Sequence, residues 1–159
     1  MSNWKTNFDS YRMDVGRKAE NLIKDMMEEL GFIVVPFGYE YLTPEFANRK
    51  NLLKGRAGEF VRGLPDFLII DKETNIAYFI EVKYRKNGEI DTEDIAEIPE
   101  SWVVLVEPGA ISIAKADYVI NEHYHEDCFN NLDIYYSPFK NKNRNTLLKY
   151  VRKTKELFG

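Results

Sequence analysis

Three ionisable residues near the middle of the chain have the types and spacing of a metal-dependent hydrolytic site. Asp66 follows Pro65 at the start of an apolar run, and Glu81 and Lys83 stand close together in the run 76–85. Because side chains alternate between the two faces of a strand, Glu81 and Lys83 are predicted to point the same way. Two carboxylates suit a hard divalent ion such as Mg²⁺. Lys83 is suited to hold or deprotonate a water molecule beside that ion.

Two strands joined by a short turn are expected to bring these residues together. Strands are predicted over 66–70 and 76–85, with a polar turn between them. A turn this short joins two strands as an antiparallel hairpin, in which the start of the first strand lies beside the end of the second. Asp66, Glu81 and Lys83 are therefore expected to converge at one end of a sheet.

A helix upstream of the hairpin supplies a fourth candidate. Apolar residues recur with helical spacing over 11–30, Ser10 or Asp9 is expected to cap the start, and Gly31 is expected to end the helix. Glu20 lies at the edge of the apolar stripe. A carboxylate in that position can reach a metal site at the end of the sheet.

These residues carry a resemblance to a nuclease superfamily. The sequence GLPD ending at Asp66, followed by FIEVK ending at Lys83, resembles the PD-(D/E)XK signature. Together with Glu20 it is similar to the archaeal Holliday-junction-resolvase branch. The resemblance implies a restriction-endonuclease-like fold and a metal-dependent endonuclease that cuts duplex or branched DNA. It implies that Asp66, Glu81 and Glu20 bind Mg²⁺, with Mn²⁺ as a substitute. Lys83 would then position or activate the attacking water.

The analogy with resolvases also implies a homodimer, because those enzymes act as two-fold dimers. The chain departs from that branch in two respects: residues 54–64 contain no serine, and the chain contains no glutamine. The resemblance covers roughly residues 11–106, and it is closer to the superfamily than to the branch.

The order of predicted elements indicates one α/β domain over residues 1–159, with a central mixed sheet flanked by helices. A long loop is expected after the first strand, with a short helix near 51–54. In the terminal helix, the residues expected to face inward are Leu147, Leu148, Val151 and Phe158. The other predicted strands are 32–37, 102–106, 111–113 and 118–120, and the basic C-terminal helix is predicted over 145–158.

The charge is unevenly distributed along a mildly acidic chain. The net charge is −4 over 159 residues, which argues against a general nucleic-acid coat protein. Residues 139–159 nevertheless carry seven Lys and Arg side chains and one acid. The residues expected to contact DNA phosphates are Arg49, Lys50, Lys54, Arg56, Arg62 and Arg85.

Two alternatives remain open at this point. The same fold could bind nucleic acid or assemble without cutting it. A weaker alternative is a zinc protein centred on His123 and His125, with Cys128 as a further ligand. The single cysteine excludes an intramolecular disulfide, and the absence of a long apolar run predicts no membrane helix. A cytoplasmic protein is expected.

Overall fold

The computed structural model describes residues 4–38, 41, 53–87, 90–92, 95, 98–121, 130–131 and 137–159. These residues form helices and strands, as the α/β prediction requires. The elements are α1 (Trp4–Glu29), β1 (Phe32–Pro36), α3 (Gly55–Arg62), β2 (Phe67–Asp71), β3 (Ala77–Tyr84), β4 (Ser101–Glu107), β5 (Ala110–Lys115), α4 (Ala116–Asn121), β6 (Asn130–Asn131) and α5 (Arg144–Phe158).

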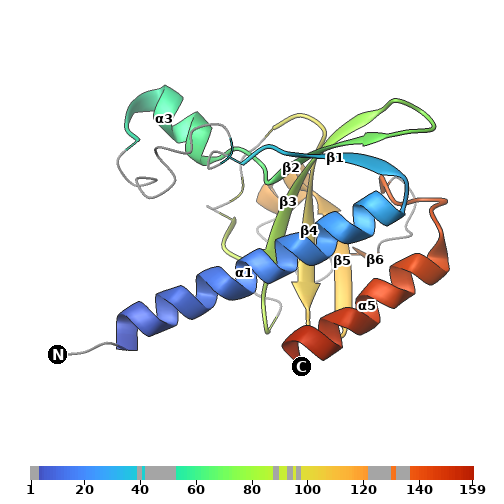
Figure 1. Ribbon diagram of the computed structural model, residues 1–159. Helices are drawn as coiled ribbons and strands as arrows, with labels where there is room; N and C mark the ends of the chain where they lie inside the picture. Colours follow the sequence, from blue (N-terminus) through green and yellow to red (C-terminus); the bar gives the residue numbers. More distant parts are fainter. Residues whose placement is uncertain are drawn as a thin grey trace.

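The strands form one mixed sheet in the order β1-β2-β3-β4-β5-β6 (Figure 1). β3 and β4 run parallel in the middle of the sheet, and the other neighbouring strands pair antiparallel. The predicted mixed sheet with flanking helices, including a C-terminal helix, is confirmed. Within the described residues, no helix combines the length and the apolar character needed to cross a membrane.

One face of the sheet is covered by α1 and α5 (Figure 1). The apolar stripe of α1 is fully buried at Ala19, Ile23 and Met26, and it packs against Ile80 and the neighbouring strands. These side chains and those of α5 form the main core. Burying side chains of this size contributes roughly 1.5–3 kcal/mol each, so this layer supplies most of the stability that holds the strands in register.

Among the described residues, a smaller cluster covers the opposite face of the sheet over β4 and β5. Val103 and Leu105 of β4 pack there with Ala116 and Val119 of α4. Val103 of this cluster is fully buried, and so is its neighbour Val104 on the first face. β4 is therefore buried on both faces, as expected for a strand near the centre of a mixed sheet.

A tight turn closes the β2–β3 hairpin that carries the predicted site. Asn75 has a φ of 59°, and its N–H donates to the Asp71 carbonyl over 2.8 Å. Asn tolerates this left-handed backbone conformation better than most residues. The turn fixes the register of β2 against β3, because Asp71 N–H in turn donates to the Ile76 carbonyl.

Two short elements differ from the sequence prediction. The predicted strand at 118–120 is wrong, because these residues belong to helix α4. Ala116 and Val119, three positions apart, are both buried. The packing of this helical face against the sheet outweighs the strand propensity of the β-branched and aromatic residues nearby. Of the helix expected near 51–54, residues 51–52 lie outside the described residues, 53–54 are not helical, and α3 begins at Gly55 after the extended backbone of Lys54.

The two long helices were predicted at nearly the right places, with two local errors. α1 begins at Trp4, so Asp9 and Ser10 lie inside the helix and do not cap it. Gly31 does follow its end, with a φ of 96° that favours glycine. In α5, Leu148 is 41% exposed, and Tyr150 is buried instead.

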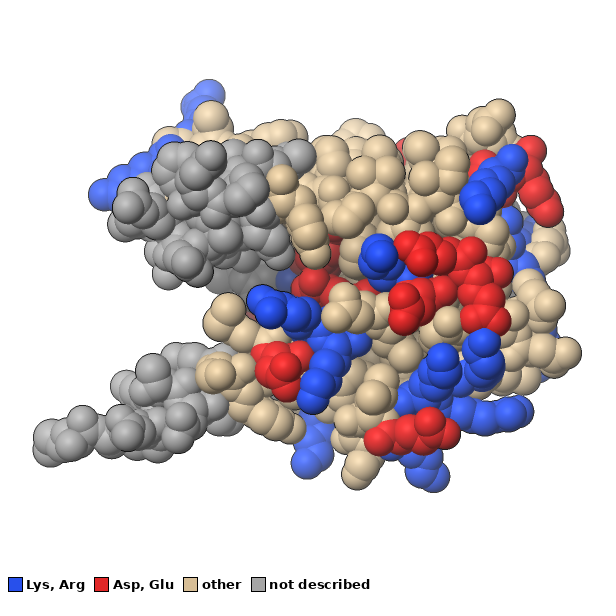
Figure 2. Space-filling model, in the orientation of Figure 1, with Lys and Arg blue, Asp and Glu red and all other residues tan. Residues whose placement is uncertain are grey.

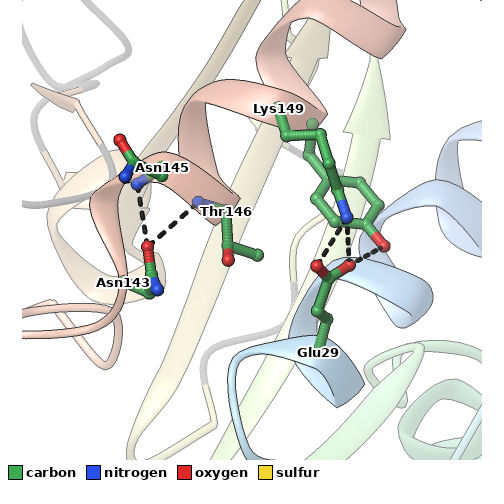
Figure 3. Close-up of polar contacts among 6 residues, drawn as sticks. Glu29, Asn143, Asn145, Thr146 and Lys149 are labelled. Atoms are coloured by element: carbon green, nitrogen blue, oxygen red, sulfur yellow. Dashed lines mark hydrogen bonds and ion pairs between the residues drawn. The ribbon is translucent and has the colours of Figure 1, made fainter.

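Polar contacts join the end of α1 to α5 (Figure 3). Lys149 Nζ lies 2.6 Å from Glu29 Oε2, and the Tyr150 hydroxyl donates to the same oxygen over 2.8 Å. Burial and this bond to Glu29 raise the pKa of Tyr150 to about 12. Asn143 caps α5, because its side chain accepts from the N–H groups of Asn145 and Thr146.

A buried ion pair ties the turn before α5 to the edge of the sheet. Lys142 Nζ lies 2.9 Å from Asp71 Oδ2, and both side chains are 10% exposed. Burial alone would raise the pKa of Asp71, but hydrogen bonds from Lys142 and from the Glu73 N–H outweigh it and lower that pKa. The Lys142 ammonium also lies over the Phe32 ring at 4.7 Å.

Candidate nuclease site

The β2–β3 hairpin places Asp66 opposite Glu81, as the sequence predicts. Phe67 pairs with Ile80 in the antiparallel register, so the next position along brings Asp66 and Glu81 together. Phe67 and Ile80 point into the main core. Because successive side chains alternate, Asp66 and Glu81 point to the other face of the sheet.

Glu81 and Lys83 form a close ion pair on that face. Lys83 Nζ lies 2.7 Å from Glu81 Oε1, and the two side chains are 17% and 15% exposed. This is the arrangement expected for residues two positions apart in a strand. At this exposure solvent screens the attraction between the two charges only partly. The attraction therefore holds the ammonium and the carboxylate together at the end of the hairpin.

Asp66 is anchored by the main chain of the partner strand. Its Oδ2 accepts a hydrogen bond from the Val82 N–H over 2.7 Å. Its own backbone carbonyl accepts from the N–H groups of Phe37 and Gly38, just after β1 ends. Three strands therefore meet at this residue, which makes its carboxylate one of the best-positioned groups in the site.

The electrostatic surroundings of Asp66 include the other three predicted site residues. Burial raises the pKa of Asp66 well above its ordinary value, and the negative charges of Glu81 and then Glu20 raise it further. The Val82 N–H and the Lys83 ammonium act in the opposite direction but do not compensate. Three carboxylates and one ammonium thus share the same end of the sheet.

Glu20 lies on α1 and acts on this group through its charge. The helix packs on the core face of the sheet, whereas Glu81 and Lys83 point to the opposite face. Asp66 stands just before β2 begins. The negative charge of Glu20 raises the pKa of Asp66, so the two carboxylates lie near enough to interact.

The site supplies carboxylate donors, but the described residues do not form a preassembled metal cluster. Carboxylate oxygens are the ligands that Mg²⁺ prefers, and a cation beside Asp66 would remove the repulsion that raises its pKa. Over the described parts of the chain, no three His, Cys, Asp or Glu side chains are grouped closely enough to hold a metal ion.

The residues predicted to contact phosphates differ in where the structure places them. Arg49 and Lys50 lie outside the described residues. Lys54 and Arg56 are exposed at the start of α3. Arg85 follows β3 directly after the site, and its Nη1 donates to the Tyr84 carbonyl over 2.7 Å.

Arg62 completes the predicted set at the end of α3. It is half-buried, and its Nε is shielded from solvent without a hydrogen-bond acceptor in the part of the chain that the structure describes. The alternative zinc ligands His123, His125 and Cys128 all lie outside the described residues.

Two features of the site escape sequence reasoning. The Val82 N–H is a main-chain donor, and no residue type signals it in advance. Phe60 on α3 is 63% exposed, although the sequence pattern alone treats aromatic residues as core. An apolar residue on the polar side of a short amphipathic helix is the signal that could have identified it.

Comparisons with protein-family models, with curated proteins and with solved structures find no match to this chain. The site must therefore be judged by its own geometry and chemistry.

Proposed function

We propose that the chain is a metal-dependent endonuclease of the PD-(D/E)XK type that hydrolyses phosphodiester bonds in DNA. The observation that carries the proposal is the convergence of Asp66 and Glu81 at one end of the β2–β3 hairpin, with Lys83 ion-paired beside them. Several partly buried carboxylates close together destabilise the fold unless a cation offsets their charge. Clusters of this kind with strongly shifted pKa values are typical of functional sites.

Asp66 and Glu81, with Glu20 as a third donor, would hold Mg²⁺ or Mn²⁺. When bound, such an ion neutralises charge on the phosphate and lowers the pKa of an attached water. The Val82 N–H holds the Asp66 carboxylate in place through its 2.7 Å bond. Fixed placement of this kind is what phosphoryl transfer chiefly requires of a protein.

Lys83 would orient the attacking water and stabilise negative charge on the phosphate. Its ammonium already lies 2.7 Å from Glu81, so the two groups share one small region. An ammonium can donate three hydrogen bonds, which lets it contact a carboxylate and a water or phosphate oxygen together. The fold would be the restriction-endonuclease-like one, and two copies would act on the two strands of a duplex.

The experiment that tests this proposal is a cleavage assay with a matched pair of variants. Wild type, Glu81→Gln and Glu73→Gln are incubated with supercoiled plasmid, linear duplex, single strand and a four-way junction, in Mg²⁺, Mn²⁺ or EDTA. Glu73 lies exposed in the turn at the far end of the same hairpin, so it controls for the chemical change alone.

We expect wild type and Glu73→Gln to cut DNA only with the metal. Glu81→Gln should be slower by at least about a hundredfold, the usual loss when a key electrostatic group is removed. Equal cleavage by Glu81→Gln would refute the assigned site. DNA binding without cleavage under every metal condition would favour the non-catalytic binding protein instead.

A further inference from the structure

Helix α3 directs an arginine and a phenylalanine away from the body of the protein. Gly58 is its buried residue, and Val61 and Arg62 are half-buried on the same side. At 100° per residue, Arg56 and Phe60 lie on the opposite side of the helix. We call these two residues the α3 ridge. Phe60 is 63% exposed there.

The surroundings of the α3 ridge are basic. Lys54 precedes the helix and Arg62 ends it, and Glu59 is the one acid between them. Figure 1 shows α3 set apart from the helices that cover the sheet. Figure 2 shows basic side chains extending from that corner of the molecule. This charge complements a polyanion.

A single exposed aromatic ring is common on protein surfaces and needs no function by itself. The α3 ridge differs because the ring lies beside an arginine at the helical i, i+4 spacing, on a basic helix. Proteins that hold unpaired nucleotides combine these same two elements: cations for the phosphates and aromatic rings on which bases stack.

The chain connection keeps the α3 ridge close to the proposed site. Asp66 follows Arg62 after a short connection, which spans at most about 14 Å when fully extended. The Cα atom of Phe60 lies about 5 Å from that of Arg62 in a helix. The Cα atoms of Phe60 and Asp66 are therefore at most about 19 Å apart, roughly the length of five to six base pairs of duplex at 3.4 Å each.

We propose that the α3 ridge stacks Phe60 on an unpaired DNA base and pairs Arg56 with a neighbouring phosphate, a few nucleotides from the bond to be cut. This inference rests on the proposed nuclease function and names its substrate more closely. In an intact duplex both faces of each base are stacked on neighbours, so the ring has no free face to contact. DNA with a gap, flap or extrahelical base provides one.

The test compares DNA binding on two ligands of the same sequence, an intact duplex and a duplex with a short single-stranded gap that contains 2-aminopurine. Binding is measured by fluorescence anisotropy in EDTA, which prevents cleavage, for wild type, Phe60→Leu and Phe60→Tyr. Tyr118→Leu is the matched control, because Tyr118 is an exposed aromatic residue on a different helix.

We expect Phe60→Leu to bind the gapped DNA about tenfold more weakly and the intact duplex within about twofold of wild type. Phe60→Tyr and Tyr118→Leu should match wild type. The 2-aminopurine fluorescence should fall when wild type binds and stay high with Phe60→Leu. Because Phe60 is exposed, its variants should melt at the wild-type temperature, which circular dichroism checks.

Equal affinity of Phe60→Leu and wild type for the gapped DNA would overturn the inference, and metal-dependent cleavage by the same preparations would show that the nuclease proposal still stands. Loss of a wild-type dimer in Phe60→Leu, seen by sedimentation with unchanged DNA affinity, would assign the α3 ridge to contact between copies and would overturn it as well. If wild type neither binds nor cuts any of the DNAs, both proposals fail.

Discussion

Replacing Asp66 with asparagine is expected to stabilise the protein while abolishing its proposed activity. The folded structure holds the pKa of Asp66 above its ordinary value, because of burial first and the charges of Glu81 and Glu20 next. A carboxyl group with a raised pKa contributes stability below its unfolded pKa and loses it as the pH rises through the folded pKa. At neutral pH the Asp66 carboxyl group therefore destabilises the fold.

The magnitude follows from the hairpin geometry. Residues opposite each other in an antiparallel pair have Cβ atoms about 5 Å apart, and two unit charges at that distance repel by about 3 kcal/mol at an effective dielectric constant of 20. Lys83 offsets part of this repulsion. We expect Asp66→Asn to raise the free energy of unfolding by about 2 kcal/mol, or the melting temperature by about 4–8 °C for a chain of this size.

The choice of asparagine matters because its side-chain oxygen can still accept the Val82 N–H. Asp66→Ala removes that acceptor and leaves a partly buried donor without its partner, at a cost of about 1–3 kcal/mol. We therefore expect the alanine variant to melt below Asp66→Asn and close to the wild-type temperature. The pair separates the effect of the charge from that of the hydrogen bond.

The assay is thermal unfolding at several pH values, in EDTA and in Mg²⁺. The advantage of Asp66→Asn should shrink as the pH falls, because wild-type Asp66 then becomes protonated. Mg²⁺ at a hundred times its dissociation constant should stabilise wild type by about 2.7 kcal/mol and leave Asp66→Asn almost unchanged. A lower melting temperature for Asp66→Asn than for wild type at neutral pH in EDTA would refute this reasoning.

Three further predictions concern the fold. Lys142→Met should lower the free energy of unfolding by about 3–5 kcal/mol, because it leaves Asp71 buried without its cation. In urea unfolding, the double variant with Asp71→Asn should recover much of this lost stability. The deficit of the single variant should shrink as the pH falls and Asp71 becomes protonated. Thr154→Val should cost about 1 kcal/mol in the same assay, because the Gly109 N–H donates to the Thr154 hydroxyl over 2.8 Å. Gly58→Ala should destabilise by about 1–3 kcal/mol, since a Cβ there would lie 2.8 Å from backbone of the preceding segment; an unchanged midpoint would show that α3 moves freely.

The parts of the fold that could be predicted from sequence are those with strong periodicity. The apolar stripe of α1 and the alternation in β3 are long enough to fix both the element and its buried face. The segment at 118–120 was misassigned because three β-prone residues carry too little pattern to outweigh packing in α4. Leu148 was misplaced because adjacent leucines leave the edge of the helical stripe undefined.

The core of the site could be predicted because it depends on local geometry alone. A short turn and a two-residue alternation bring Asp66, Glu81 and Lys83 together without any knowledge of the tertiary structure. The exposure of Phe60 depends on how α3 packs, and the Val82 N–H bond depends on the register of two strands to within one residue. The main-chain bond leaves no mark in composition or spacing, and the position of Phe60 on the polar side of α3 is its one signal in the sequence.

The four central strands of the sheet form two local hairpins, and this arrangement bears on the order of folding. β2–β3 and β4–β5 each join strands that are adjacent in sequence, and the parallel β3–β4 pair seals them together. Hairpins of this kind form in about 1–10 μs, whereas contacts between distant segments form later. Asp66, Glu81 and Lys83 should thus meet in the earliest folding intermediates, and Glu20 should join them only when α1 docks. The proposed site would then assemble in two kinetic stages.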